Sequence, residues 1–488
     1  MARDSLHLVV VDDLSPLERY GWVVDHIARL PGSGIVYTLT VADAQRLAAV
    51  IAGVHGQEVP VAAYTGGLEA SERERLEDAL RNNELKALVA TSALGMGYDK
   101  PDLGFVVHVG SPPSPVSYYQ QVGRAGRGID EAQVILLPSS ADSGVWDYFA
   151  TATIPDPKQI DQLFDAWDGE VASVPALEAV SGLRRGKVEL MLKQLAVDKA
   201  VERVEGGWRR TGFPWSYDAE HYDGIIATRR READIMRAYC RGASCLMQLL
   251  QESLDDPTAE PCGRCSVCRG GLLDGLDARP PADVMRSVTT LLRGENHLLE
   301  PRKMWPGGDF GSKGRIAAEV MADEGRVLIH ADAPEWRDVV AEAFAPNSPA
   351  PTEVLDASVA LLARWRHNWP ERPEVVVSLA AAGSARLVGE VAAHLADVGR
   401  LEGGAVDVGS AGSDNGTSGG DRSSAQEAAW WRDHLSVSDD LSRALDGRVA
   451  LLVVDASASM WPVTLGAAAL RQAGARRVLP LVLHRRVG

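Results

Sequence analysis

The sequence lacks several features that would assign it quickly to a class. None of its 488 residues belongs to a phosphate-binding loop of the form GxxxxGK[ST], and no uninterrupted apolar run is long enough to span a membrane. The most apolar late stretch, VALLVVDASASMWPVTLGAAAL, is broken by Asp455 and Pro462. The start, MARDSLHLVVVDD, shows no basic region followed by a long apolar core, so no secretory signal is evident. We therefore expect a cytoplasmic protein with no membrane partner.

Positive charge is also scarce. The chain has 50 Lys and Arg against 67 Asp and Glu, a formal net charge of −17, which argues against a generally cationic surface that coats nucleic acid. Any contact with nucleic acid must therefore be local. The content of 45% hydrophobic and 24% charged residues is ordinary for soluble globular proteins, and this length accommodates about three domains.

Cysteine is rare and clustered. Five cysteines lie between positions 240 and 268, which excludes a disulfide scaffold and indicates a metal site in a reducing compartment. Cys262, Cys265 and Cys268 form CGRCSVC, whose two-residue gaps can bring thiolates onto one zinc ion. Cys240 and Cys245 compete for the fourth position, because residues five apart on a helix differ by roughly 140° in direction. An iron–sulfur cluster is the alternative, since CxxCxxC also begins ferredoxin-type runs.

The order of patterns along the chain predicts four regions. In 1–152, short Val/Ile/Leu runs alternate with helical patterns, which is typical of a parallel α/β sheet with helices on both faces and ligand sites after the strands. In 153–214, three helical segments and a Gly-Gly hairpin predict a winged helix. Residues 215–275 read as a helical module with the cysteine knuckle. Residues 276–488 resume α/β alternation, with a Gly/Ser-rich flexible loop near 403–424.

The stretch SYYQQVGRAGRG, residues 117–128, carries the strongest signal for a ligand. Arg124 and Arg127 stand on Gly-rich backbone, where guanidinium groups can grip phosphate oxygens and glycine lets the backbone approach. Alone, GRAGR can be a basic surface turn. Together with GIVYTL, AAYTGGL (62–68) and VATSALGMGYDKPDLGFVVHVG (89–110), it resembles the second motor domain of the RecQ family of DNA helicases.

The resemblance implies a nucleotide site shared with a first RecA-like domain. Arg127 would be the arginine finger that meets the γ-phosphate of ATP, and Arg124 and Gln120 would couple that site to movement. Gly97 and Asp99 would contribute to ATP binding with these two arginines. Thr91 and Ser92, at the start of the same loop, would touch a DNA phosphate.

The family's first motor domain supplies the phosphate-binding lysine and the magnesium carboxylates, and this chain begins after them. We therefore expect ATP and Mg²⁺ to bind only with that missing domain, and we expect no appreciable ATP hydrolysis by this chain alone. The family's zinc spacing selects Cys245, Cys262, Cys265 and Cys268 for a structural Zn²⁺ and leaves Cys240 as a buried small apolar residue.

Local positive charge gathers in the expected winged helix. From position 184 to 210 there are eight Lys and Arg against four Asp and Glu. Trp208 would stack on an unpaired base, or else pack beneath the wing. The cations expected to meet DNA phosphates are Arg184, Arg185, Lys187, Arg209 and Arg210. The run Arg229, Arg230 and Arg231 is read as a solvated helix face.

A winged helix placed before the zinc module, together with the last region, resembles the RqlH type of RecQ-like helicase, whose C-terminal domain is similar to phosphoribosyltransferases. In the corresponding signature this chain keeps Asp455, Ser459 and Trp461, but Val454 and Met460 replace an acid and a glycine that hold phosphoribosyl pyrophosphate. We expect that fold without transferase activity.

The sequence thus predicts an α/β multidomain protein with a RecA-like domain, a winged helix, a Cys₄ zinc module and a phosphoribosyltransferase-like domain. It would be the C-terminal portion of an ATP-dependent 3′-to-5′ DNA helicase, associated with the nucleoid, that acts on DNA with a 3′ single-stranded tail in repair or recombination. The alternatives are a non-catalytic DNA-binding or regulatory subunit and a divergent phosphoribosyltransferase.

Overall fold

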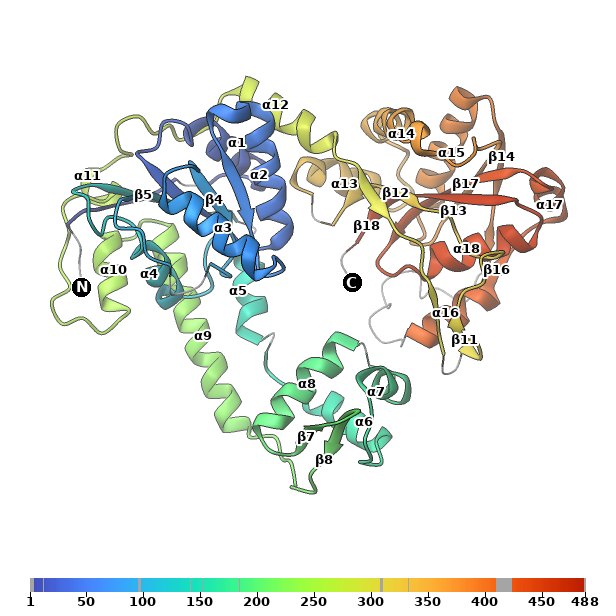
Figure 1. Ribbon diagram of the computed structural model, residues 1–488, viewed down its shortest axis with the longest axis horizontal. Coiled ribbons are helices and arrows are strands. Elements are labelled where there is room, and N and C mark those ends of the chain that lie inside the picture. The colour runs from blue at the N-terminus through green and yellow to red at the C-terminus, as the bar shows by residue number, and fades with distance from the viewer. Residues whose placement is uncertain are drawn as a thin grey trace. The chain divides into compact units, whose positions relative to one another are not determined.

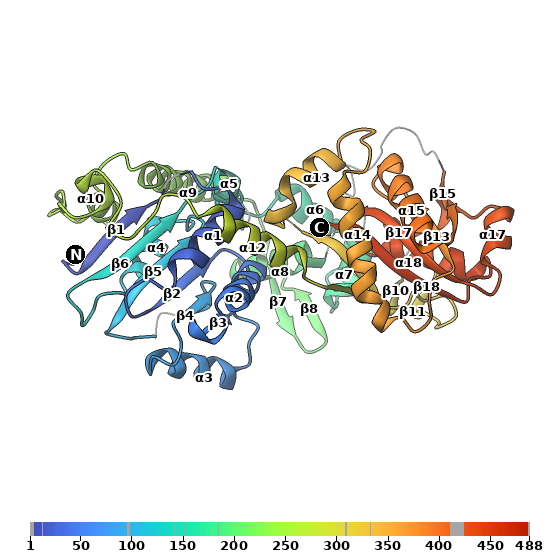
Figure 2. The ribbon, with the colours of Figure 1, turned by 90° about the horizontal axis from the view of Figure 1, so that it is seen from above.

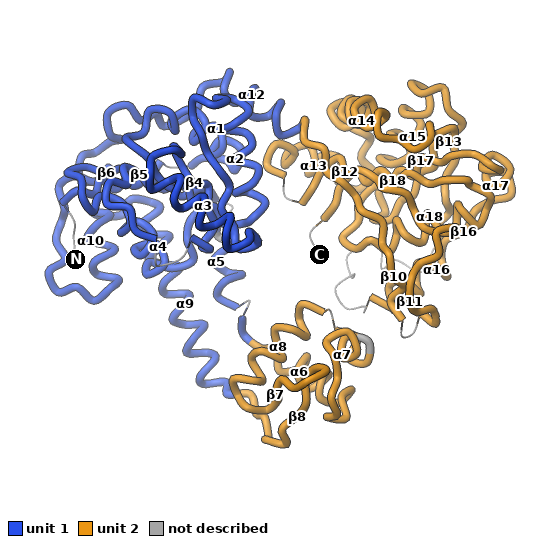
Figure 3. Tube along the Cα trace, in the orientation of Figure 1, with its two compact units in different colours: residues 1–154, 218–293 blue, residues 155–217, 294–488 orange. Residues whose placement is uncertain are grey.

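The chain folds into two compact units (Figures 1 and 3). The computed structural model describes residues 4–11, 13–94, 98–140, 142–151, 153–183, 185–307, 310–331, 333–409 and 424–486. Unit 1 comprises Met1–Ile154 and Asp218–Arg293, and unit 2 comprises Pro155–Tyr217 and Gly294–Gly488. The chain therefore leaves unit 1 at residue 155, returns to it at residue 218 and leaves it again at residue 294.

A six-stranded parallel sheet forms the centre of unit 1, in the order β1-β6-β5-β2-β4-β3. Central strands are buried on both faces, as Val/Ile/Leu-rich runs require in a parallel sheet. The parallel sheet predicted for this region is therefore confirmed. Its strands are β1 (Leu6–Val10), β2 (Ser33–Thr38), β3 (Val61–Tyr64), β4 (Ala87–Ala90), β5 (Leu103–Val109) and β6 (Ala132–Leu137).

Helices cover both faces of this sheet and make two separate cores. One face is covered by α3 (Ala70–Arg81), α4 (Pro115–Val122), α9 (Ala219–Cys240) and α10 (Leu246–Glu252). The other face is covered by α1 (Pro16–His26) and α2 (Val41–His55). Local sequence fixes where these two helices start, because Ser15 and Glu18 form a capping box before α1 and Thr40 caps α2. The remaining helices of this unit are α5 (Asp142–Thr151), α11 (Ser266–Arg269) and α12 (Ala282–Arg293).

Helix α12 packs against α1 and α2 (Figures 1 and 2). Glycines make room for it: a Cβ at Gly21 would lie 2.3 Å from Met285 Sδ, and one at Gly53 would lie 2.9 Å from Leu291 Cδ1. The segment before it is held by Trp22, whose indole nitrogen donates to Asp277 O at 2.7 Å. Unit 1 therefore continues to Arg293, beyond the boundary between 275 and 276 that the sequence suggests.

Residues 155–217 of unit 2 contain the predicted three helices and hairpin. They are α6 (Pro157–Ala166), α7 (Val174–Ser181), α8 (Arg185–Val197), β7 (Val201–Val204) and β8 (Gly207–Arg210). Strands β7 and β8 are antiparallel, and a bridge between Ala172 and Trp208 extends the ribbon. Ile160, Leu177, Val188 and Leu192 lie in a core of their own.

A second six-stranded sheet organises residues 294–488, in the order β14-β13-β17-β18-β12-β9. All its strand pairs are parallel except β12 with β9. The strands are β9 (His297–Leu299), β12 (Gly325–His330), β13 (Val375–Leu379), β14 (Glu402–Ala405), β17 (Val449–Ser457) and β18 (Arg477–Arg485). One face is covered by α13 (Arg337–Ala343), α14 (Thr352–Trp365) and α15 (Ala385–Gly399), and the other by α16 (Ser424–His434), α17 (Asp439–Leu445) and α18 (Trp461–Gln472).

Part of the segment expected to be a flexible loop is a strand. β14 pairs with β13, and β15 (Asp407–Val408) pairs with β16 (Leu435–Ser436). The glycines suit this place because Leu441 packs over Gly404, where a Cβ would lie 2.7 Å from its Cδ1. Glycine there serves close packing as well as freedom of the backbone. The rest of the predicted loop, 410–423, lies outside the described residues.

No helix in the described part of the chain is both long enough and apolar enough to cross a membrane.

Candidate functional site

The loop between β4 and β5 runs from the carboxyl end of one strand to the amino end of the other, and β2 lies between these two strands in the sheet. It starts at Thr91, where β4 ends, and runs to the residues just before β5. Thr91 is buried and its backbone N–H donates to Tyr64 O at 3.2 Å, whereas Ser92 is exposed. Asp99 is exposed near the other end of the loop. Gly97, expected to contact ATP, lies outside the described residues.

Arg127 is the accessible arginine of the GRAGR turn. Its side chain is 39% exposed, its Nη1 lies 2.9 Å from Asp99 Oδ1, and its Nε donates to Gly123 O at 3.1 Å. The turn is fixed because the N–H of Gly126 donates to Leu103 O. Gly126 has φ of +65°, and a Cβ there would lie 2.6 Å from Ser5 Oγ, so glycine is required for both conformation and space.

Arg124 has a different environment from Arg127. It is 6% exposed, and its guanidinium donates to Leu94 O at 3.3 Å and to Tyr98 O at 3.0 Å. These two carbonyls lie on either side of the undescribed residues 95–97 of the loop. The structure therefore does not place the two arginines together at the surface, and Arg124 holds the loop from within. Gln120 is exposed on α4.

A buried histidine, His108, contacts Tyr118 and Gln121 of α4. His108 Nε2 lies 2.8 Å from Gln121 Oε1, and the ring stacks on Tyr37 and meets the edge of Tyr118. Burial lowers the pKa of His108 to about 4, and the bond to Gln121 opposes this only in part. The imidazole is therefore neutral at pH 7, with the proton on the nitrogen that faces the amide oxygen.

A buried ion pair fixes the loops that follow β5 and β6. Arg19 Nη1 lies 3.0 Å from Asp142 Oδ1, and the other oxygen of this carboxylate accepts N–H bonds from Ser111 and Ser139. These residues are far apart in sequence, so local patterns give no signal for the pair. A lone Arg on an amphipathic helix is ordinarily read as exposed.

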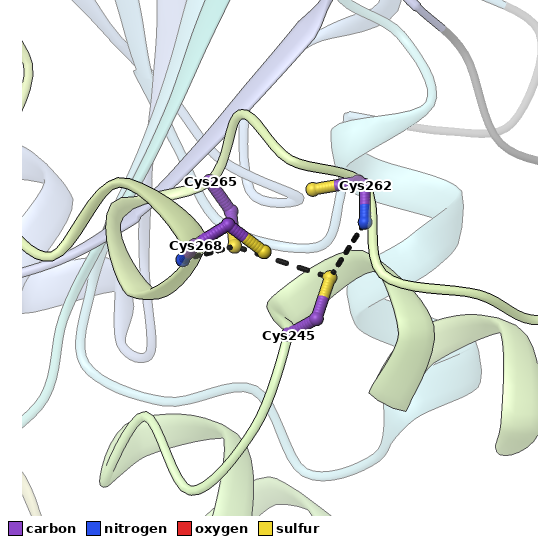
Figure 4. A group of neighbouring side chains, drawn as sticks. All are labelled: Cys245, Cys262, Cys265 and Cys268. Carbon is purple, nitrogen blue, oxygen red and sulfur yellow. Dashed lines mark hydrogen bonds between the residues drawn. The ribbon is translucent and has the colours of Figure 1, made fainter.

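Four cysteines converge beside the first strand of the sheet (Figure 4). The sulfur atoms of Cys245, Cys262, Cys265 and Cys268 lie within 4.8 Å of one another, and those of Cys245 and Cys265 are 4.0 Å apart. A tetrahedral zinc site with Zn–S bonds of about 2.3 Å needs sulfurs about 3.8 Å apart. The four side chains therefore fit a zinc ion. Cys245 precedes α10 directly and Cys265 precedes α11, so two helix starts position two of the ligands.

Backbone N–H groups prepare the cysteine sulfurs for metal binding. Burial acts to raise the pKa of Cys245, but the N–H groups of Cys262 and Gln248 donate to its sulfur, and the pKa falls to about 7. Burial raises the pKa of the other three thiols. Because a cation stabilises thiolates, a bound metal would reverse those increases.

Cys240 lies outside this group. It is buried at the end of α9, and its sulfur is 3.4 Å from Ser111 Oγ. A second cluster of possible ligands, Asp25, His26 and Asp277, lacks a free imidazole nitrogen. His26 Nδ1 bonds to Trp22 O, and Nε2 accepts the N–H of Asp277. That cluster therefore fastens the chain before α12 and does not suit a metal.

The residues expected to bind DNA in the hairpin region are mostly engaged within the protein. Trp208 is half-buried against the core of residues 155–217, as the packing alternative predicts. Arg209 pairs with Glu202 at 2.5 Å, and Arg185 pairs with Glu189 at 3.0 Å. The guanidinium of Arg210 lies over the ring of Phe164, 4.4 Å from its centroid. Lys187 is exposed, and Arg184 lies outside the described residues.

Asp455 has a structural role near the carboxyl end of β17, an interior strand of the second sheet. Its carboxylate is fully buried and accepts N–H bonds from Ala382 at 3.0 Å, Ser384 at 2.9 Å and Ala456 at 2.8 Å. Burial raises its pKa, and these backbone donors act in the opposite direction. A carboxylate engaged in this way is not available to hold ribose hydroxyl groups.

The two other residues that match the transferase signature also form hydrogen bonds within the chain. Ser459 Oγ donates to Glu427, and the indole nitrogen of Trp461 donates to Ser424 Oγ at 3.0 Å. The Arg302 guanidinium lies 3.9 Å from the Trp461 ring centroid. Trp461, at the start of α18, is therefore in contact with the side chains of Ser424 and Arg302.

The sheet of unit 1 and the arginine turn at its edge define a class. Residues 20–128 match the family described as "Helicase conserved C-terminal domain". The described part of residues 20–128, with its parallel sheet and arginine turn, is therefore similar to the C-terminal domain of helicases.

Within that class the chain is similar to RecQ DNA helicases. It is 34% identical over 140 residues to "ATP-dependent DNA helicase RecQ" of Pasteurella multocida, which covers 29% of this chain and 21% of that protein. It is 37% identical over 127 residues to the Bacillus subtilis protein of the same name, covering 26% and 21%. A Synechocystis RecQ is 28% identical over 295 residues, covering 55% and 56%. The alignments span about a fifth of the first two relatives' length.

Proposed function

We propose that this chain is the C-terminal portion of an ATP-dependent DNA helicase of the RecQ-like family, of the RqlH type. The observation that carries the proposal is the accessible Arg127, paired with Asp99 at one end of a loop whose other end bears Ser92. One end of this loop thus lies beside an arginine that can bind phosphate. The other end follows the carboxyl end of β4, the side on which parallel sheets bind ligands. This arrangement suits a protein that links nucleotide to DNA.

The chain's own residues have separate roles in this proposal. Arg127 exchanges Asp99 for the γ-phosphate of ATP when a first RecA-like domain closes on it, and Gln120 lies exposed on the preceding helix. Arg124 keeps the loop in position, so that a shift at Asp99 reaches Thr91 and Ser92. With Mg²⁺, ATP supplies the free energy that drives movement along DNA in the 3′-to-5′ direction.

We further propose that Cys245, Cys262, Cys265 and Cys268 hold a structural Zn²⁺. The ion would fasten α10 and α11 to the first strand of the sheet, because α11 lies against that strand and Ser266 Oγ accepts the N–H of Val10. The role is structural because all four coordination positions are filled by protein.

The remaining parts serve substrate choice in this proposal. Residues 155–217 act as a winged helix that meets DNA with a 3′ single-stranded tail, chiefly through Lys187 and α8. The last region keeps a phosphoribosyltransferase-like fold without that activity, a view supported by the buried Asp455. The cellular setting would be DNA repair or recombination.

The experiment that tests the motor is single-strand-stimulated ATP hydrolysis by two proteins. One is this chain alone, and the other is this chain fused to a RecA-like first domain from a RecQ relative. We expect ATP hydrolysis only by the fusion. Arg127→Ala should lower the turnover rate of the fusion about 10²- to 10³-fold, the usual effect of losing one donor to the transition state.

Robust turnover by the chain alone would contradict the expectation that it lacks half of the site. If neither protein hydrolyses ATP although the fusion is folded and binds DNA, the result would favour the alternative of a non-catalytic DNA-binding subunit. Release of pyrophosphate from phosphoribosyl pyrophosphate would revive the transferase alternative.

A further inference from the structure

Two adjacent aromatic rings are exposed near the end of α5. Tyr148 is 65% and Phe149 is 42% exposed, and among the described residues Phe213 is the other aromatic with comparable exposure. The two rings meet edge to face, with centroids 5.6 Å apart and planes at 73°. Most aromatic side chains bury their large apolar surface, so a pair left in solvent indicates a contact surface.

The helix that carries this pair is firmly anchored. Trp146 is buried one turn earlier and its indole nitrogen donates to Pro112 O at 3.1 Å. Ala150 is buried on the same side. Exposure of the two rings therefore follows from which face α5 turns to the core.

Positive charge from α9 lies along this helix. Arg229 Nη1 donates to Phe149 O at 3.4 Å and to Ala150 O at 3.3 Å, so this guanidinium lies at the C-terminal end of α5. The next residue, Arg230, is exposed. The exposed acid of α5, Asp147, lies 3.5 Å from Arg237, which also covers the Trp146 ring. Arg237 is shared between Asp147 and Asp234, from which its Nη1 lies 2.7 Å, so the cations available near the two rings are Arg229 and Arg230.

We propose that Tyr148 and Phe149 stack on unpaired bases of a DNA strand whose phosphates are met by Arg229 and Arg230. The inference rests on the DNA-binding part of the proposed function and adds a contact outside the helicase motifs. Rings next to arginines match a base next to its phosphate, which is the pattern of single-strand binding surfaces. In a chain of net charge −17, attraction for an anionic strand has to come from such local sets.

Fluorescence anisotropy of the full chain tests this surface with three probes of equal length. They are an oligo-dT strand, the same sugar–phosphate strand without bases, and a duplex. The double variant Tyr148→Ala/Phe149→Ala is expected to bind oligo-dT about 5- to 30-fold more weakly, the loss of roughly one base stack, and to bind the baseless strand like the wild type. Tyr148→Trp in the Phe149→Ala background is expected to restore most of the difference.

Two further variants separate stacking from charge and from general surface effects. Arg230→Gln is expected to weaken binding of the dT and baseless strands alike and to reduce the salt dependence by about one released ion. Val54→Ala removes another exposed apolar side chain of unit 1 and is expected to change nothing. Thermal melting checks that all variants remain folded.

The inference is overturned if the double variant binds oligo-dT as tightly as the wild type, or loses equal affinity for the dT and baseless strands. A wild-type chain that binds no strand would contradict the proposed function itself. The two failures are distinguishable, because the first requires measurable binding by the wild type.

Discussion

Arg124 and Arg127 are three positions apart, but only one of them is available to a ligand. Arg124 donates to two carbonyls inside unit 1, whereas Arg127 pairs with Asp99 at the surface. A surface pair of this kind contributes little to stability and is easily exchanged for a better anion. Buried donors to backbone carbonyls contribute more, because their loss leaves those carbonyls without partners.

We predict that Arg124→Ala lowers the free energy of unfolding of unit 1 by about 2 to 3 kcal/mol, because two buried carbonyls lose a charged donor. The amides of residues 91–99 should then exchange with deuterium faster. Urea unfolding and hydrogen–deuterium exchange measure the two effects. Arg127→Ala is the matched control and should change stability by less than about 0.5 kcal/mol. Equal effects of the two substitutions would contradict the assigned roles.

Because His108 is buried and neutral, we predict that the stability of unit 1 falls in acid. Its pKa is about 4 in the folded protein and 6.5 when unfolded, so between these values the unfolded chain binds a proton that the folded chain does not. Stability is therefore unaffected above pH 6.5 and falls as pH drops toward 4, by on the order of 3 kcal/mol in total.

The test compares urea unfolding of the wild type and His108→Gln between pH 7 and pH 4. The variant should lose stability less steeply with acid, since glutamine cannot take up the proton, although its stability at pH 7 is lower because the ring packing is lost. Parallel curves for the two proteins would show that His108 is not the group responsible.

At the scale of elements, the cysteine knuckle joins α10 and α11 to the sheet. Neither helix is long enough to be stable on its own, with seven and four residues. Their order must come from tertiary contacts, and four converging sulfurs supply a point where one ion can fix both. The pattern CGRCSVC contains three of the four converging cysteines, and the fold brings Cys245 and not Cys240 to them.

We predict that the purified chain holds one zinc per molecule and that Cys245→Ser lowers this content, because one of four ligands is lost. Metal analysis by mass spectrometry measures the content, and circular dichroism measures the helical signal, which should fall on chelation. Cys240→Ser is the matched control and should keep the metal. Iron with visible absorption in place of zinc would establish the cluster alternative.

At the scale of the whole chain, unit 1 is completed by a segment that arrives late in the sequence. Val288 and Leu292 of α12 are fully or almost fully buried in the core on the α1 and α2 face. Fully burying such a side chain contributes about 1.5 to 3 kcal/mol. Helix α12 is therefore part of the fold of unit 1, whereas the sequence pattern places the start of the next region before it.

We predict that a chain cut after Arg293 keeps the stability of unit 1, whereas a chain cut after residue 275 loses roughly 3 kcal/mol or more, because Val288 and Leu292 no longer cover its core. Urea unfolding followed by the fluorescence of Trp22 compares the two. A single-site version uses Leu292→Ala, with the partly exposed Leu291→Ala as its control. Equal stability of the two truncated chains would remove α12 from the domain.

Much of this architecture is readable from the sequence because its signals are local. Apolar runs of strand length, capping residues and turn glycines act within a few positions, so the parallel sheet, the three helices with their hairpin and the cysteine set were predictable. The side-chain environments were less so. For Trp208 the sequence leaves base stacking and packing open, and only the structure shows that its side chain is half-buried against the core of residues 155–217.

The sequence by itself determined which residue types stand in which element: an arginine pair on glycines, four cysteines with ligand spacing, and apolar strands at α/β intervals. The tertiary structure decided which of those side chains face outward. Arg124 is buried, whereas Arg127 lies at the surface and pairs with Asp99. The carboxylate of Asp455 accepts bonds from backbone amides, and α12 packs on unit 1. Tyr148 and Phe149 remain exposed to solvent. The physical reason is that conformational preference is set by near neighbours, whereas burial is set by tertiary contacts with residues tens to hundreds of positions away.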